Sequence, residues 1–234
     1  MPRLEDQLNQ AQMHLQRGDV AMAMGLIDAA LKRAPSNPQT LWLLGMAHLS
    51  SGNAAEAVAP LERALKPDPR NGAVLDGLGL AYLMLERYAE AADVLRRVTK
   101  LPHAPAIVFM RLGLALLNTH DAEGAVRELQ HAASLDPHDP VVHMNLGRAL
   151  ARAGDHGAAR EAFLKVVARS PSDLDAREAL YTSCMALGRT GEAIPQMRHV
   201  AQAEPDNPAV LQALASALFE TGQLEESQRQ IGRA

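Results

Sequence analysis

The chain has 234 residues, of which 47% are hydrophobic, 3% aromatic and 21% charged, and its formal net charge is -4. This mild acidity excludes a protein that depends on a strongly basic surface to bind nucleic acid or anionic membrane. The single cysteine, Cys184, excludes an internal disulfide bond and favours a reducing compartment.

The N-terminal segment does not predict a targeting signal. Its most apolar stretch, from Val20 to Ile27, is short, is flanked by Asp19 and Asp28, and follows an acidic opening, so it is not typical of a secretory signal. No apolar run reaches the length of about 18 residues that a membrane-spanning helix needs. We therefore expect a cytoplasmic protein without membrane insertion.

In chain order, the apolar residues follow a helical period in two segments of about a dozen residues over 4–37. A turn at Arg17-Gly18-Asp19 separates the segments, and Pro35 ends the second. The two segments return over 38–71, 72–105, 106–139, 140–173, 174–207 and 208–234, and most of these units also carry the glycine turn and the closing proline. This fixed 34-residue period predicts stacked helix pairs.

Gly45 lies inside the first predicted helix of the second unit, where glycine costs about 1 kcal/mol relative to alanine. Gly79, Gly113 and Gly147 follow at the same place in the next three units. We interpret these glycines as points where the two helices of a unit approach closely, with the small residue Ala57 in the facing second helix.

These units resemble the tetratricopeptide repeat, whose pattern combines a bulky residue, Leu-Gly, a large residue, an alanine, a further bulky residue and a proline. The third unit matches with Leu75, Leu78-Gly79, Tyr82, Ala91 and Leu95, but carries His103 in place of the proline. The fifth unit matches with His143, Leu146-Gly147, Leu150, Ala159, Phe163 and Pro171. The resemblance implies an all-α fold, a right-handed α-solenoid of antiparallel helix pairs with about 14 helices, forming one repeat domain over 1–234.

Some positions depart from the pattern. Tyr181 stands at the glycine position of the sixth unit and Arg177 at its first bulky position, which predicts looser packing there. Pro60 and Pro195 fall inside second helices, where a proline removes one backbone hydrogen bond.

The resemblance also implies that the first helices line a concave groove. Its candidate partner-binding residues are Trp42, Met46, Asp76, Leu80, Met84, Met110, Leu114, Asn118, Met144, Arg148 and Arg152. The N-terminal part of this set is apolar and rich in methionine, a flexible side chain that adapts to varied partners. Towards the C-terminus the residues at the groove positions become polar, and they continue to Gln212 and Ser216. Two interpretations remain open: a groove for an apolar or amphipathic segment, or side chains buried between neighbouring helices by the curvature of the solenoid.

A second candidate patch is basic. Arg148 and Arg152 lie one helical turn apart, with Asn145 beside them and Arg111 one repeat earlier, and arginine binds carboxylates well. The alternatives are ion pairing with Asp175 and Glu178, or a solvated face. Some relatives hold a terminal carboxylate with a Lys-and-Asn clamp, which this chain lacks. Its first-lysine positions hold Leu8, Trp42 and Asp76.

Signatures of catalysis are missing from the sequence. The nine histidines form no zinc-type spacing with an acidic third ligand, no glycine-rich phosphate loop or nucleophile elbow occurs, and Cys184 is expected to be a small buried residue. We therefore expect no metal, no cofactor and no enzymatic activity.

Three functional interpretations follow. The first is a non-catalytic scaffold or adaptor that binds a peptide or a partner protein in its groove. The second is the N-terminal arm of a larger bacterial enzyme resembling glycosyl- or sulfotransferases, and the third is a self-assembling protein that forms homo-oligomers through the solenoid ends. The polar residues Glu225, Gln228 and Arg229 in the last helix favour a natural end or a position near one, whereas the lack of an extra capping helix leaves a truncated chain as the alternative.

Overall fold

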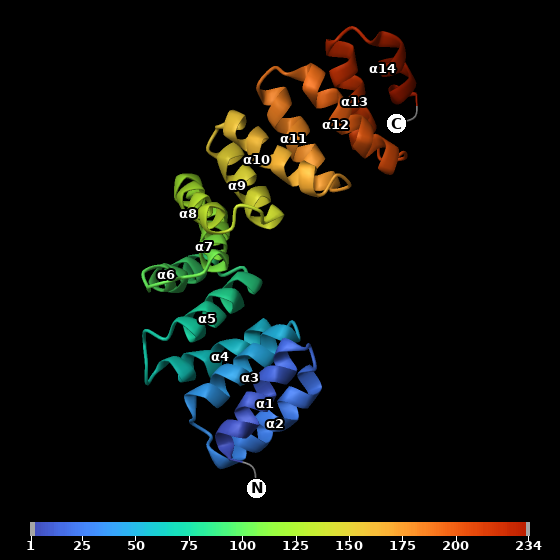
Figure 1. Cartoon of the computed structure of the whole chain (residues 1–234). Coiled ribbons are helices and arrows are strands. Elements are labelled where there is room, and N and C mark those ends of the chain that lie inside the picture. The colour runs from blue at the N-terminus through green and yellow to red at the C-terminus, as the bar shows by residue number, and fades with distance from the viewer. Residues whose placement is uncertain (1–2, 233–234) are drawn as a thin grey trace. The chain divides into compact units, whose positions relative to one another are not determined.

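The structure is a computed structural model that describes residues 3–232. These residues form fourteen α-helices and no β-strand (Figure 1). The prediction of an all-α fold with about 14 helices is confirmed.

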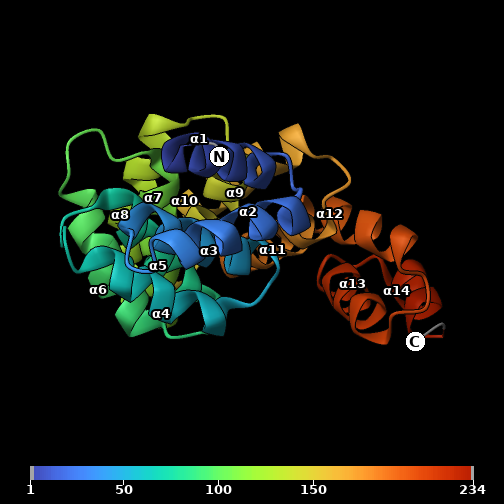
Figure 2. The same ribbon diagram turned by 90° about the horizontal axis from the view of Figure 1, so that it is seen from below.

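The helices divide between two compact units, an N-terminal unit up to Asp121 and a C-terminal unit from Ala122 onward. The N-terminal unit holds α1 (Leu4–Gln16), α2 (Val20–Arg33), α3 (Pro38–Ser50), α4 (Ala54–Leu65), α5 (Gly72–Met84), α6 (Tyr88–Thr99) and α7 (Ala106–Asn118). The C-terminal unit holds α8 (Ala122–Leu135), α9 (Pro140–Arg152), α10 (His156–Arg169), α11 (Leu174–Ala186), α12 (Thr190–Ala203), α13 (Pro208–Glu220) and α14 (Leu224–Ile231). Within each unit, helices adjacent in sequence pack against each other, as α13 and α14 do in Figure 2.

Capping residues explain where the helices begin and end. Asn37 accepts a hydrogen bond from the backbone N–H of Thr40, and Pro38 occupies the first position of α3, where its missing N–H is not needed. The turn after α3 places Gly52 at φ 78°, a left-handed conformation that glycine adopts without strain. In the third and fourth repeats the same turn position holds Glu86 and His120, which adopt positive φ without that freedom.

The interior glycines make the close contacts between the two helices of a repeat that the sequence predicted. A Cβ on Gly45 would lie 2.5 Å from Cγ of Leu61 on α4, and the same spacing brings Gly79 against Leu95 and Gly147 against Phe163. Ala57 lies in the facing helix α4 and is fully buried. This is where the sequence placed it, and the side chain for which Gly45 makes room is the leucine one turn further on.

The sixth repeat has a large residue at both of these positions. Tyr181 replaces the glycine, and at the place of Leu61 the chain carries Met197, an unbranched side chain that adapts to irregular space. Tyr181 packs against the hydrophobic cluster that contains Met197. Its hydroxyl donates to the carbonyl oxygen of Ala213 at 3.0 Å, which ties α11 to α13.

Side chains of the following repeat bond the proline carbonyls of the inter-repeat loops. Arg63 donates to the carbonyl oxygen of Pro35 at 2.9 Å, and Arg97 donates to that of Pro69. In the C-terminal unit, a ring nitrogen of His143 lies 2.8 Å from the carbonyl oxygen of Pro137, and Arg177 donates to that of Pro171. These bonds satisfy carbonyl groups that no helix satisfies.

Candidate functional site

The predicted groove residues of the N-terminal unit lie on three successive first helices, α3, α5 and α7. We call this set the first-helix row. It comprises Trp42, Met46, Asp76, Leu80, Met84, Met110, Leu114 and Asn118. Met84 is 44% exposed and the other seven are half-buried. The row is thus neither a sealed core nor a fully solvated face.

Trp42 connects this row to the core. It packs against the buried cluster of the first two repeats, and it also lines a hollow of about 330 Å³ with residues at the start of α3 and α5, among them Asn71 and Val74. Its indole N–H is buried and has no hydrogen-bond acceptor among the described residues. Met46 lies on the next turn of α3, and its sulfur would be 3.4 Å from a Cβ on Gly77 of α5.

An ion pair lies within the row. Asp76 of α5 accepts hydrogen bonds from the guanidinium of Arg111 of α7 at 2.5 and 2.6 Å through its two carboxylate oxygens. Both side chains are largely buried, with exposed fractions of 29% and 19%. The sequence grouped Arg111 with the predicted basic patch, and the structure brings it to Asp76. The amide of Asn118 donates to the carbonyl oxygen of Leu114 in its own helix.

The predicted site residues of the C-terminal unit have different surroundings. Met144 is buried, whereas Arg148 and Arg152 are exposed. A guanidinium nitrogen of Arg148 lies 3.8 Å from a carboxylate oxygen of Asp175, which is one of the two ion pairs that the sequence offered as an alternative. Burial raises the pKa of Glu178, and the charges of Glu204 and Asp175 add to the shift.

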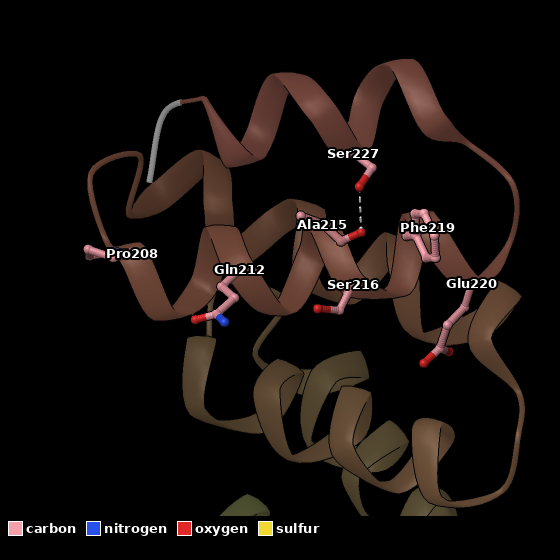
Figure 3. A pocket seen from close by; sticks show the side chains of 7 residues that line it. All are labelled: Pro208, Gln212, Ala215, Ser216, Phe219, Glu220 and Ser227. Carbon is pink, nitrogen blue, oxygen red and sulfur yellow. Dashed lines mark hydrogen bonds between the residues drawn. The ribbon is translucent and has the colours of Figure 1, made fainter.

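A larger hollow lies on α13 and α14, with a volume of about 600 Å³. Figure 3 shows Gln212, Ser216 and Glu220 along one side of α13, and Ser227 donating to the carbonyl oxygen of Ala215 at 2.8 Å. Gln212 and Ser216 belong to the polar, C-terminal part of the groove that the sequence predicts.

Phe219 also lines this hollow, and sequence reasoning missed it. Its side chain is 67% exposed, whereas the equivalent residues of the second and fourth repeats, Leu49 and Leu117, are 7% and 4% exposed. The repeat register alone marks the position. A phenylalanine at a position where the other repeats carry leucine, alanine or methionine is the signal that could have identified it.

The other candidate chemistry is limited. Cys184 is a free, buried thiol, and burial is the main cause of the rise in its pKa, so its reactive thiolate form is disfavoured. Within residues 3–232, no group of three or more histidine, cysteine, aspartate or glutamate side chains has a metal-binding arrangement. None of the helices in this range is both long and apolar enough to cross a membrane.

Stacked antiparallel helix pairs with a first-helix surface define a helical repeat protein, a class whose fold suits protein-interaction scaffolds. Profiles of the tetratricopeptide repeat match residues 8–72, 43–105 and 110–173, and a second profile of the same repeat matches 185–234. The chain therefore belongs to the tetratricopeptide repeat family. No curated protein sequence matches it significantly.

Solved structures of repeat proteins have the same fold. The structure of Pseudomonas aeruginosa pilF is 19% identical, covers 93% of this chain and 97% of its own, and gives a TM-score of 0.75. YrrB, described as a tetratricopeptide repeat protein with an unusual peptide-binding site, is 21% identical over 80% of this chain and 96% of its own, with a TM-score of 0.71. MamA is 22% identical over 72% and 92%, with a TM-score of 0.66. At these identities the similarity establishes the fold alone.

Proposed function

We propose that the chain is a non-catalytic adaptor and that its first-helix row binds an apolar or amphipathic segment of a partner protein. The observation that carries this proposal is the half-buried state of the row together with its composition. Six of the eight side chains are apolar, and three of those are methionines. A surface of this kind can lose further solvent contact when a partner covers it, which is the main source of binding free energy.

The ion pair between Asp76 and Arg111 supports the same proposal. A lone carboxylate in an apolar groove would oppose the binding of an apolar segment, because burying an unpaired charge is costly. Arg111 compensates that charge on the chain itself. The partner segment then needs no cation at this point, and an apolar face is enough.

Further parts of the proposal concern the C-terminal unit, the domain organisation and the kind of partner. We propose that Arg148 and Arg152, exposed on α9 of the C-terminal unit, form a second, polar contact for the partner, in which Arg148 would exchange Asp175 for an acidic group. Met144, one turn earlier on the same helix, is buried and adds no exposed surface. We also propose that the seven repeats form a single repeat domain over 1–234, because the first helices recur with the same period through both units. The peptide-binding site described for YrrB favours a peptide as the partner.

The proposal is tested by selecting peptides from a displayed random library against the intact chain. The selected peptides should carry apolar residues with helical spacing, and their binding should change the fluorescence of Trp42, the only tryptophan. Met84→Glu should weaken binding at least about tenfold, which corresponds to about 1.4 kcal/mol.

Met22→Glu is the matched control. Met22 is also an exposed methionine, at 61%, and lies on the second helix α2, outside the row. Equal loss of binding in both variants would contradict the proposal, as would peptides with no apolar pattern. Circular dichroism of both variants shows whether the helices remain folded, and so distinguishes a loss of binding from a loss of folding.

A further inference from the structure

A small basic hollow lies in the N-terminal unit, away from the first-helix row. It occupies about 330 Å³ between the loop that precedes α5 and the C-terminal end of α6. Its lining residues are Pro69, Arg70, Leu75, Arg97, Lys100 and Leu101. None of them belongs to the first-helix row, so an inference from this hollow is independent of the proposed function.

Three of the lining side chains are cationic and no carboxylate lines the hollow. Arg97 uses one guanidinium nitrogen to bond the carbonyl oxygen of Pro69. The side chains of Arg70 and Lys100 have neither an ion-pair nor a hydrogen-bond partner among residues 3–232. This concentration of positive charge contrasts with the formal net charge of the chain, which is -4.

The helix dipole accounts for only part of this charge. Cations at the C-terminal end of a helix are favourable because the free carbonyl groups there carry about half a negative charge. Lys100 is the C-cap residue of α6 and Arg97 lies in its last turn, so both benefit from this effect. Three cations exceed that half charge even together with Asp68, whose carboxylate accepts a hydrogen bond from the backbone N–H of Arg70 at 3.1 Å. Arg70 itself belongs to the loop, outside the helix. The excess leaves room for an anion.

The preceding repeat shows what is particular to this hollow. Lys66 and Arg63 stand one repeat before Lys100 and Arg97, at the end of α4. Thirty-four residues before Arg70 and Leu101, the chain has Ser36 and Pro67. The junction of the second and third repeats therefore adds one cation and one apolar side chain to an arrangement that otherwise recurs.

The floor of the hollow is apolar. Leu75 is 1% exposed, and Leu101 is half-buried. Gly72 gives Leu101 its space, because a Cβ on Gly72 would lie 2.9 Å from a terminal carbon of Leu101. The volume is at the lower end of the range of small-molecule sites, about 300 to 1,000 Å³. It fits a small apolar group and one anionic head.

We propose that this hollow binds a phosphate or carboxylate group attached to an apolar or aromatic body. The guanidinium groups of Arg70 and Arg97 supply planar donors for the oxygens of the anion, and Lys100 supplies a compact charge. The apolar body lies on Leu75 and Leu101. Free inorganic phosphate uses only the cations and binds more weakly.

The test uses the intact chain and titration calorimetry at low ionic strength, with phenyl phosphate, benzoate and inorganic phosphate as probes. Phenyl phosphate or benzoate should bind at least tenfold more tightly than inorganic phosphate, and the better of the two shows whether the site prefers a phosphate or a carboxylate. The Arg70→Ser, Lys100→Gln double variant should weaken that binding at least tenfold. Raising the ionic strength should weaken it in the unmodified chain.

Lys66→Gln is the matched control, since Lys66 has the same place at the end of its helix. It should change the affinity less than twofold. Gly72→Ala, which would displace Leu101, should weaken phenyl phosphate more than inorganic phosphate. Equal weakening by Lys66→Gln would overturn the site, as would the absence of binding by any probe. Equal affinity for phenyl phosphate and inorganic phosphate would overturn the apolar part of the ligand.

Discussion

The substitution Gly45→Ala tests the packing that defines each repeat. The added Cβ would lie 2.5 Å from Cγ and 2.7 Å from Cδ2 of Leu61, a side chain with no exposed surface. Relief requires the whole leucine side chain to move, because Cγ is its branch point. Overpacking of this kind costs about 1–3 kcal/mol. Alanine recovers about 1 kcal/mol of helix propensity. We expect a net loss of stability of up to about 2 kcal/mol.

Gly25→Ala is the matched control. Gly25 lies inside α2 of the same unit, and a Cβ there would meet nothing within 4 Å. Only the propensity gain remains, so this variant should be more stable by up to about 1 kcal/mol. The two glycine-to-alanine substitutions should thus have opposite signs.

Urea unfolding followed by Trp42 fluorescence is the assay. Trp42 lies in the same helix as Gly45, so it reports the local transition even where a repeat array does not unfold in a single step. In a Leu61→Ala background the clash is absent, and Gly45→Ala should become stabilising. If Gly45→Ala is neutral in the intact chain, or keeps its sign in that background, then the contact with Leu61 does not explain the glycine.

Two further predictions concern partly buried polar groups. Burial raises the pKa of both Tyr82 and Tyr181 above the ordinary value of 10.0, so above that pH the unfolded chain loses these protons first and the free energy of unfolding should fall as pH rises. Urea titrations at pH 8 to 11 should show this fall, and it should be smaller in Tyr181→Phe, whereas an unchanged slope would contradict the assignment. Separately, Asp76→Asn should destabilise the N-terminal unit by about 1–3 kcal/mol because it leaves Arg111 without its anionic partner. Arg111→Met in the Asp76→Asn background should recover part of that loss in a double-mutant cycle, and simple additivity of the two changes would argue against the pair.

The sequence by itself determined the repeat and the helices. Apolar spacing, turn residues and prolines are local signals, and they act on the same few residues that form each helix. First helices therefore begin at Leu4, Pro38 and Gly72, where the repeat register starts its units. The register also placed the first-helix row, because residues on one face of a helix recur with a fixed period.

Only the tertiary structure decided which side chains meet. It paired Gly45 with Leu61 and not with Ala57, and it brought Asp76 to Arg111 across two helices. It also left Phe219 exposed at a position where the second and fourth repeats bury a leucine. Each of these outcomes depends on side-chain direction and on packing between helices. Both are long-range properties, and the period of one helix does not contain them.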